Sequence, residues 1–518
     1  MDWSFGRIFT AVGRAVPADD PALIHGDAVT TWGSLDRRTD ALAAAFIAAG
    51  AAPGDKLAHL MRNGPAYCET TVAGFKARLV HVNVNYRYTG EELFYILDNS
   101  DAAVLVHDAE FTAVVATLVP RLPRLKLVVA VGPEYEALAT SGAALPPQEH
   151  SSDDLLFIYT GGTTGTPKGV MWAQGDLWTL IGGGAELGGV PLAGLEELLA
   201  NIAAGRGRQR TLVMPPLMHG TGFLSAVSTL ARGGCVITLP SPGFVPLEAL
   251  AACAAHRPDH AAIVGDAFAR PLLAALDHGG GGIASIRTIV SSGTMWSPEV
   301  KAGLLRHNPE LMLVDALSSS ESIGIGLAVS TAATAGEPTR FTQGVETLVL
   351  DDDLHPVVPG SGITGRLARG GLNPRGYYKD PAKSAATFVR IGGTTYSVAG
   401  DWATVDADGQ VVLLGRGSHC INTGGEKVFP EEVEEALKTH AAVDDALVFG
   451  VADARWGEAV TAVVAGSVAS EADLIAHVRT LLAPYKAPKR VIYVSEVPRA
   501  PNGKADYVRA KDLAAATV

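Results

Sequence analysis

Fourteen residues from Tyr159 to Trp172, YTGGTTGTPKGVMW, contain four glycines, four threonines and one lysine, and they begin at the end of the apolar run LLFIY. Glycines let backbone N–H groups approach a ligand closely, threonine hydroxyls add hydrogen-bond donors, and the lysine adds a positive charge. These residue types in this order predict a cradle for phosphate groups. A turn-rich surface loop is the plainer interpretation, and it fits poorly with a loop that follows an apolar strand directly.

The stretch does not match the Walker A pattern of P-loop kinases and ATPases. That pattern ends in Gly-Lys followed by Ser or Thr, whose hydroxyl holds magnesium at the mouth of a helix. Here Lys168 follows Pro167 and precedes Gly169 and Val170, so this hydroxyl is missing. The sequence argues against P-loop chemistry and leaves the phosphate cradle in place.

A carboxylate follows another apolar run. In VDALSSSESIG, Glu321 comes after three serines and the run LMLV. A carboxylate at the end of a strand, in a loop of hydroxyls, suits magnesium coordination beside phosphate oxygens. Taken alone, the same residue is explained more simply as an exposed structural glutamate.

Three more charged residues stand toward the C-terminus. Asp401 and Arg416 are joined by a predicted hairpin through DADG. Such an acid and base could share the two hydroxyls of a ribose, or they could form a salt bridge. Lys504 lies in a predicted turn of RAPNGKADY, where most lysines are only solvated. It gains a chemical role only if its domain can carry it to the threonine-rich loop.

The elements around these residues predict an α/β protein, because β-rich runs alternate with helical patterns ahead of the hairpin. SLDRRTDALAAAFIAAG places Leu35, Leu42 and Phe46 on one helical face, with Ser34 as its predicted N-cap and Gly50 as its stop. The runs LVHVNVN and AAVLVHD flank another helical pattern. Strand, helix and strand in succession imply parallel sheets covered by helices.

The pattern of predicted strands and helices changes after residue 415. From there it reads as strand, helix, two strands, helix and strand. We therefore expect a large N-terminal domain of several subdomains with parallel-rich sheets over residues 1–415. A small mobile α+β domain follows over residues 416–518, with a hinge near Arg416.

The whole-chain composition excludes several functions. A length of 518 residues predicts two or more domains, and 47% hydrophobic with 18% charged residues is globular. A net charge of −13 argues against a nucleic-acid partner. The four scattered cysteines, with no CxxC and no histidine at ligand spacing, predict reduced thiols rather than disulfides or a zinc site.

Neither a secretory nor a membrane segment is predicted. The N-terminal MDWSFGRIFTAVGRAVPADD lacks a basic region followed by an apolar core. The uncharged run from Thr211 to Ala231 is long enough to span a bilayer, but its double proline, histidine and three threonines favour a buried loop and helix. We expect no transmembrane segment and a cytoplasmic location.

The order of seven blocks resembles the adenylate-forming superfamily of acyl-CoA synthetases, luciferases and peptide-synthetase adenylation domains. These blocks are YTGGTTGTPKGV, PPLMHGTG, SSSE, GYYKDPAKSAATF, AGD, GRGSHCINTGGEKVFPEEVE and PNGK. The resemblance covers nearly the whole chain, and the first and sixth blocks are each fairly specific. Within the superfamily the chain looks most like bacterial fatty-acyl and steroid side-chain CoA ligases.

The resemblance implies ATP-dependent activation of a hydrophobic carboxylic acid. The acid would become an acyl-adenylate with release of pyrophosphate, and the acyl group would pass to coenzyme A, with Mg²⁺ as the metal. Two alternatives stay open: an adenylating enzyme that uses another acid or acceptor, through amine ligation or nitrite-dependent diazotisation, and a non-catalytic binding protein that kept the fold. Homodimers are common in the superfamily, but no motif here fixes one.

The same resemblance implies roles for particular residues. The phosphate contacts would be Thr160, Gly161, Thr163, Thr164 and Lys168. Ser320 would be a nucleotide contact, and Glu321 would ligate magnesium. Asp401 would bind the ribose with Arg416 beside it. Lys504 would be the catalytic lysine at the α-phosphate. Residues near coenzyme A would be Gly424, Gly425 and Lys427.

An acyl pocket is implied as well. His219 would stand at its mouth and take part in catalysis, although a core histidine bonded to backbone is the alternative. The pocket would be lined by Val264, Gly265, Asp266, Ser292, Gly293, Thr294 and Trp296. Two departures from the family pattern concern the adenine contact, where Leu317 and Ser318 replace an aromatic residue and glycine, and the hinge, where Ser418 replaces Asp or Lys.

Overall fold

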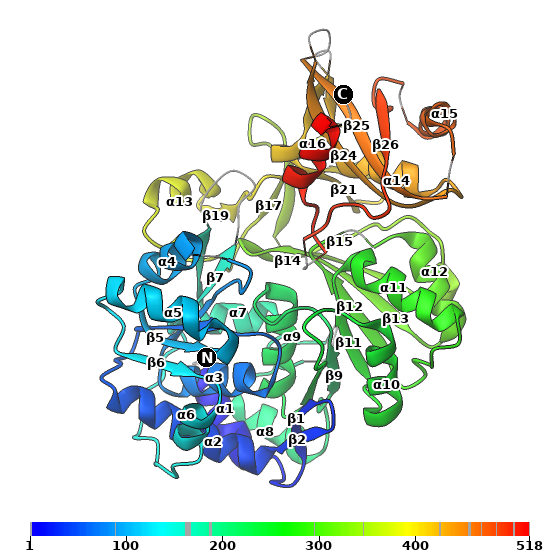
Figure 1. The fold of residues 1–518 in the computed structure, drawn as a ribbon. Helices are drawn as coiled ribbons and strands as arrows, with labels where there is room; N and C mark the ends of the chain where they lie inside the picture. The colour runs from blue at the N-terminus through cyan, green and yellow to red at the C-terminus, as the bar shows by residue number, and fades with distance from the viewer. Residues whose placement is uncertain are drawn as a thin grey trace. The chain divides into compact units, whose positions relative to one another are not determined.

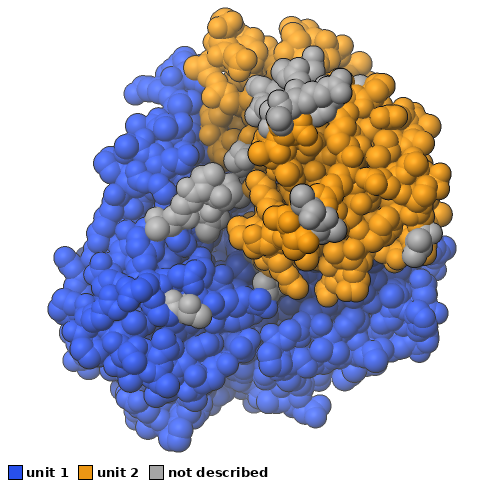
Figure 2. Space-filling view, turned by 45° about the horizontal axis from the view of Figure 1, so that its top comes forward, with its two compact units in different colours: residues 1–324, 329–336, 371–397 blue, residues 325–328, 337–370, 398–518 orange. Residues whose placement is uncertain are grey.

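The computed structural model describes residues 3–88, 90–160, 167–185, 189–294, 296–344, 346–423, 426–453, 457–467, 469–482, 484–500 and 503–516. The chain divides into two compact units, coloured separately in Figure 2. Unit 1 comprises residues 1–324, 329–336 and 371–397, and unit 2 comprises residues 325–328, 337–370 and 398–518. The expected domain boundary after residue 415 falls inside unit 2. That residues 416–518 form a separate mobile domain stays a prediction.

One sheet of unit 1 carries the threonine-rich stretch. Its strand order is β6-β5-β3-β4-β7-β8. The strands are β3 (Lys56–Leu60), β4 (Val80–Asn83), β5 (Ala102–His107), β6 (Leu127–Ala130), β7 (Leu155–Thr160) and β8 (Lys168–Ala173). Strands β3 to β7 are parallel, and β8 is antiparallel to β7. Every residue of β5 is buried, as expected for a parallel strand covered on both faces.

A second sheet of unit 1 follows the order β2-β1-β10-β9-β11-β12-β13-β14. Its strands are β1 (Pro21–His25), β2 (Ala28–Thr31), β9 (Arg210–Val213), β10 (Cys235–Thr238), β11 (His260–Ile263), β12 (Thr288–Ser292), β13 (Met312–Ser319) and β14 (Ser322–Ser330), the last divided between the two units. Strands β1 and β9 to β13 pair in parallel.

Helices cover both faces of this second sheet. α10 (Pro246–His256), α11 (Gly265–Asp277) and α12 (Pro298–His307) lie together beside β11 to β13 in Figure 1. Leu212 belongs to the apolar cluster beneath these helices, whereas Val213 packs with α9 (Gly220–Ala231) in the other cluster. Successive residues of a strand point to opposite faces, so both sides of the sheet are buried. The expected α/β architecture with parallel sheets is confirmed.

The remaining helices of unit 1 connect or cover these sheets (Figure 1). They are α1 (Phe5–Ala15), α2 (Trp32–Ala48), α3 (Pro65–Lys76), α4 (Gly90–Asn99), α5 (Thr112–Leu118), α6 (Pro133–Ala139), α7 (Gln174–Leu180), α8 (Leu195–Ala203) and α13 (Pro381–Thr387). A hairpin of β18 (Phe388–Ile391) and β19 (Thr394–Ser397) follows α13. Short 3₁₀ turns are η1 (Ala109–Phe111), η2 (Val119–Arg121) and η3 (Ala332–Thr334).

Helix α2 shows where the sequence was correct and where it was wrong. Leu35, Leu42 and Phe46 are buried on its inner face, as predicted. The predicted cap Ser34 already lies in the first turn, and its N–H donates to the side chain of Thr31, the actual N-cap, at 3.3 Å. Thr31 has the extended conformation that an N-cap needs because it ends β2.

Unit 2 contains an antiparallel part and the predicted α+β part. The first consists of β16 (Thr347–Leu350), β17 (Gly365–Arg369), β20 (Asp401–Val405) and β21 (Val411–Arg416). The short β15 (Thr342–Gln343) pairs antiparallel with β14 instead. The second consists of η4 (Gly417–His419), β22 (Ile421–Thr423), β23 (Glu426–Val428), α14 (Pro430–Lys438), β24 (Val443–Asp453), β25 (Gly457–Gly466), α15 (Glu471–Leu481), β26 (Arg490–Tyr493) and α16 (Tyr507–Ala516).

The predicted C-terminal order of strand, helix, two strands, helix and strand is confirmed from β23 to β26, whereas the short β22 before it and α16 after it were not predicted. Its core is formed where α14 and α15 pack on β24 and β25, around Val433, Leu474 and Val460. Among the described residues, no helix is both long and apolar enough to cross a membrane. The apolar run from Thr211 to Ala231 is the end of β9, a loop and α9.

Candidate active site

The threonine-rich stretch is a hairpin connection between β7 and β8. Thr160 lies directly opposite Lys168 in the antiparallel ladder, so both stand at the mouth of the loop. Gly161, Thr163 and Thr164 lie outside the described residues. Lys168 begins a strand, whereas a Walker A lysine stands at the mouth of a helix. The geometry agrees with the argument against a P-loop.

Lys168 forms an ion pair with Asp380. Asp380 is the N-cap of α13, where its other oxygen accepts a hydrogen bond from Lys383 N at 2.9 Å. These two donors hold the pKa of Asp380 below its ordinary value. The N-cap carboxylate of α13 is therefore the anion that Lys168 binds in this structure.

Glu321 lies in the two-residue turn between β13 and β14, as its position after an apolar run predicted. Tyr377 donates a hydrogen bond from its hydroxyl to Glu321 Oε1 at 2.8 Å, and its ring centroid is 6.0 Å from Lys168 Nζ. The backbone of this turn is held by Trp172, whose Nε1 donates to Ser320 O at 2.9 Å. One tyrosine thus brings the predicted phosphate lysine and the predicted metal ligand to the same place.

The environment of Glu321 fits a magnesium ion that is shared with a nucleotide. Within the described ranges, no group of three or more His, Cys, Asp or Glu residues could hold a metal by itself. Mg²⁺ at phosphate sites is commonly bound through one or two carboxylates, substrate phosphates and water. A single carboxylate beside the predicted phosphate-binding lysine meets that requirement.

His219 is the N-cap residue of α9, and its carbonyl accepts from Phe223 N at 2.9 Å. Two residues further along, Thr221 donates from its hydroxyl to Ser292 O at 3.1 Å. The hydroxyl of Ser292 donates to Ala316 O at 2.7 Å, in the strand that leads to Glu321. These bonds tie the start of α9, the end of β12 and β13 into one edge of the sheet.

The two segments expected to line an acyl pocket lie side by side. Gly265 begins α11 with a left-handed φ of 50°, and its N–H donates to the buried Ser291 Oγ at 2.9 Å. Asp266 accepts hydrogen bonds from the backbone N–H of Ser297 at 2.9 Å and from its hydroxyl at 2.5 Å. The remaining predicted lining residues are adjacent in sequence: Val264 precedes Gly265, and Gly293 and Thr294 follow Ser292.

Trp296 is a core residue. Its side chain is 1% exposed and packs in the apolar cluster beneath α11 and α12. Its ring lies 5.7 Å from Nζ of Lys301, a buried lysine that pairs with Asp315. The role of Trp296 in an acyl pocket stays a prediction.

Asp401 and Arg416 are directly opposite each other in the hairpin of β20 and β21, within unit 2. The chain turns between these strands through DADG, as predicted, and Gly417 N donates to Gly400 O at 2.9 Å just beyond the pair. The side chain of Arg416 is not among those described. The register brings the two predicted ribose residues together, and the choice between ribose binding and a salt bridge stays open.

Lys504 is exposed in a tight turn of unit 2. Its carbonyl accepts from Ala500 N at 2.7 Å, and Gly503 N donates to Ala500 O at 2.8 Å. Arg499 supports this turn, because Nη1 donates to Gly503 O at 3.2 Å while Nε and Nη2 each bind the carboxylate of Asp445 at 2.6 Å. The predicted catalytic lysine therefore stands on an anchored backbone.

The predicted coenzyme A contacts are only partly described. Gly424 and Gly425 lie outside the described residues. Lys427 belongs to β23, where it lies opposite Asn422, and its side chain is not described. The assignment of these residues stays a prediction.

Tyr377, Asp380, Trp172, Arg499 and Asp445 were not assigned roles from the sequence. The signal for three of them was present, because Tyr377 and Asp380 belong to the block GYYKDPAKSAATF and Arg499 precedes PNGK. Their partners are remote in sequence, so the blocks alone could not reveal the contacts.

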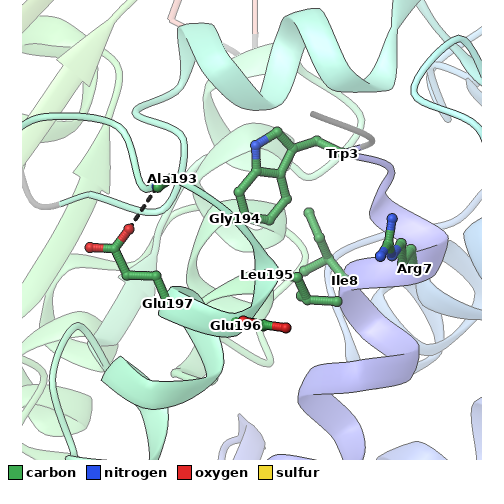
Figure 3. A pocket seen from close by; sticks show the side chains of 8 residues that line it. All are labelled: Trp3, Arg7, Ile8, Ala193, Gly194, Leu195, Glu196 and Glu197. Atoms are coloured by element: carbon green, nitrogen blue, oxygen red, sulfur yellow. Dashed lines mark hydrogen bonds between the residues drawn. The ribbon is translucent and has the colours of Figure 1, made fainter.

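A cavity of about 410 Å³ lies elsewhere on unit 1. Figure 3 shows its lining by Trp3, Arg7, Ile8 and residues 193–197, with Glu197 accepting a hydrogen bond from Ala193 N at 2.6 Å. None of the predicted site residues lines it. This cavity is distinct from the candidate active site.

Comparison with known families and proteins gives one consistent result. The model of the AMP-binding enzymes matches residues 9–378, and that of the AMP-binding enzyme C-terminal domain matches residues 432–504. The chain is 41% identical to 3-oxocholest-4-en-26-oate–CoA ligase of Rhodococcus rhodochrous, over 95% of this chain and 92% of that protein. It is 39% identical to a medium/long-chain-fatty-acid–CoA/3-oxocholest-4-en-26-oate–CoA ligase of Mycobacterium marinum, over 96% and 94%.

The fold has a close counterpart among solved structures. The anthranilate CoA ligase AuaEII in complex with anthranoyl-AMP superposes with a TM-score of 0.84, over 99% of this chain and 98% of that one. Its sequence identity is 22%, so the likeness concerns the fold.

Proposed function

We propose a substrate for this chain, which belongs to the AMP-binding enzyme family and is an AMP-forming acyl-CoA ligase. The substrate is a medium- or long-chain fatty acid or the side-chain acid of a steroid. The observation that carries the proposal is the full-length identity to ligases with those names. In the reaction, a carboxylate oxygen attacks the α-phosphorus of ATP and pyrophosphate leaves. The thiol of coenzyme A then loses its proton and attacks the acyl carbon, and AMP leaves.

In the first step, Lys168 and the hairpin loop would hold the phosphates that leave. The support is that Lys168 already binds an anion, the Asp380 carboxylate, which the nucleotide would replace. Glu321, oriented by the Tyr377 hydroxyl, would ligate Mg²⁺. Bound magnesium would neutralise phosphate charge, which an attack by one anion on another requires.

Unit 2 would contribute the other nucleotide contacts. Asp401 would bind the ribose hydroxyls with Arg416 beside it, supported by their direct opposition in the hairpin. Lys504 would stabilise the charge that develops at the α-phosphate, supported by its exposure on a turn that Arg499 anchors. For the second step, residues 416–518 would rotate as a domain, withdraw Lys504 and present Gly424, Gly425 and Lys427 to coenzyme A. None of the four cysteines, all of which lie in the described ranges, forms a disulfide, and this supports a cytoplasmic location.

Substitution of Lys504 tests this assignment. In Lys504→Ala, acid-dependent release of pyrophosphate should fall to background, while thioester formation from a supplied acyl-adenylate should continue at a rate close to that of the unaltered chain. Lys511→Ala is the matched control, because it removes another exposed lysine from the same unit. Adenylation that survives in Lys504→Ala would contradict the mechanism.

A substrate screen tests the choice of acid and acceptor. Pyrophosphate release should be measured with fatty, aromatic and steroidal acids, with and without coenzyme A. We expect the highest turnover with fatty or steroidal acids, and consumption of the coenzyme A thiol in parallel. Pyrophosphate release without thioester formation for every acid would favour a different acceptor.

A further inference from the structure

Asn83 is a buried amide whose three hydrogen bonds join two separate segments of unit 1. It is the last residue of β4 and is 7% exposed. Nδ2 donates to Tyr159 O at 2.9 Å and to Met218 O at 2.8 Å, while Oδ1 accepts from Tyr159 N at 2.7 Å. Both amide protons and one lone pair are therefore used, and the side chain has one orientation that satisfies all three contacts.

The two segments are those that lead into the two halves of the candidate active site. Tyr159 immediately precedes Thr160, at the mouth of the phosphate loop. Met218 immediately precedes His219, at the start of α9. The same amide group thus fixes the backbone next to the predicted nucleotide contact and next to the predicted acyl contact.

A second asparagine shows that this connection is particular to Asn83. Asn63 donates from Nδ2 to Pro215 O at 2.9 Å and accepts from Leu217 N at 2.7 Å. It holds the segment before His219, but its bonds do not reach β7. Since the segment 215–218 is fixed at both ends by amides, a displacement of Met218 would pass to Tyr159 through Asn83.

We propose that Asn83 is a positioning residue that couples the binding of the acid to the binding of ATP. The inference rests on the proposed function, because it takes the loop after Thr160 as the nucleotide site and His219 as part of the acid site. A substrate that binds beside either segment restrains the backbone of that segment. Because Asn83 bonds both segments, the restraint extends to the backbone that the other substrate must contact. The second substrate then loses less conformational entropy on binding, and the coupling is reciprocal.

The test compares two aspartate substitutions. Asn83→Asp keeps the shape of the side chain but turns the donor toward Tyr159 O and Met218 O into an acceptor. Asn308→Asp is the matched control. Asn308 is also 7% exposed, donates to Ile283 O at 3.1 Å and Ile286 O at 2.8 Å, and accepts from Glu310 N at 3.1 Å. Both variants therefore lose the same kind of contacts, but only one stands beside site residues.

The measured quantity is the ratio of two dissociation constants for the acid, without and with α,β-methylene-ATP and Mg²⁺. The acid is whichever of dodecanoate and 3-oxocholest-4-en-26-oate gives more pyrophosphate in the screen above. For the unaltered chain and Asn308→Asp we expect a ratio of about five or more, typical of coupled sites. For Asn83→Asp the ratio should approach one.

Two outcomes overturn the inference while the proposed function stands: a ratio of one in the unaltered chain, or an unreduced ratio in Asn83→Asp. An unaltered chain that binds neither the acid nor the ATP analogue would overturn the proposed function itself. Should Asn83→Asp not fold, Asn83→Ala replaces it. Hydrogen–deuterium exchange on the unaltered chain gives an independent result, since the acid alone should slow exchange in residues 155–160. Unchanged exchange there would refute the coupling.

Discussion

Tyr377 is the side chain on which the two charged groups of the predicted phosphate site converge. Its hydroxyl binds Glu321 and its ring lies near Lys168. Tyr377→Phe removes only the hydroxyl, so Glu321 loses the group that orients it. Because such a hydrogen bond contributes about 1 kcal/mol, we expect KM for magnesium–ATP to rise about fivefold with little change in KM for the acid.

The neighbouring tyrosine provides the control for this prediction. Tyr378 donates from its hydroxyl to Asp101 Oδ2 at 2.7 Å, so Tyr378→Phe also removes one partly buried phenol–carboxylate bond. Steady-state kinetics should show an unchanged KM for magnesium–ATP in this variant. Equal effects in both variants would indicate general destabilisation and not a role at Glu321.

Arg499 carries a prediction about the Lys504 turn. Its guanidinium binds Asp445 through two nitrogens and Gly503 O through a third. The single ammonium of lysine cannot reproduce this fork. In Arg499→Lys, adenylation should slow by about tenfold, since small displacements of a catalytic group have large effects on rate.

The half-reactions separate this positioning effect from a loss of structure. Thioester formation from a supplied acyl-adenylate should be unaffected in Arg499→Lys, because Lys504 is proposed to act only in the first step. Arg490→Lys is the control, since Arg490 donates to Ala514 O in the same unit without contacting the turn. A parallel loss of both half-reactions in Arg499→Lys would count against the assignment.

The strands β3 and β4 place two histidines inside unit 1, and this makes its stability depend on pH. His59 and His81 are buried with ring centroids 4.6 Å apart. Burial lowers the pKa of His59 to about 4, and it also lowers the pKa of His81. An unfolded histidine titrates near 6.5, so between these values the unfolded chain binds protons that the folded chain excludes.

The free energy of unfolding should therefore fall as the pH is lowered from 6.5 toward 4. For one histidine the slope is at most about 1.4 kcal/mol per pH unit. His59→Leu keeps a similar volume without a titrating ring and should flatten the profile across this window. Denaturant unfolding between pH 4 and 8 measures it, and profiles that run parallel for the two chains would contradict the prediction.

Elements were easier to predict from the sequence than contacts were. The alternation of strands and helices and the C-terminal order follow from hydrophobic periodicity, which can be recognised within a short segment of the sequence. The N-cap of α2 was misplaced by three residues because Thr31 and Ser34 are both good caps, and only the end of β2 decides between them. The partners Tyr377 and Glu321 are 56 residues apart, and Lys168 and Asp380 are 212 apart, so no local pattern reports them.

The proposed rotation of residues 416–518 gives a prediction for the whole molecule. Ser418, the predicted hinge residue, stands in the 3₁₀ turn that follows β21. In Ser418→Pro, the fixed φ of proline and its effect on Gly417 should restrict the rotation. Adenylate formation in a single turnover should persist, while transfer to coenzyme A slows by a factor on the order of ten. If both steps slow equally, the pivot lies elsewhere.

The antiparallel direction of β8 has a consequence for how this chain attracts a nucleotide. A loop that runs from a strand into a helix offers its anion the positive end of a helix dipole and a row of free N–H groups. The connection from Thr160 to Lys168 runs from strand to strand, so no helix follows it directly. The attraction would then rest more on discrete charges such as Lys168, and salt screens exposed charges over about 10 Å at 0.1 M. Nucleotide affinity should therefore depend strongly on ionic strength, and affinities measured in different buffers compare only at equal ionic strength.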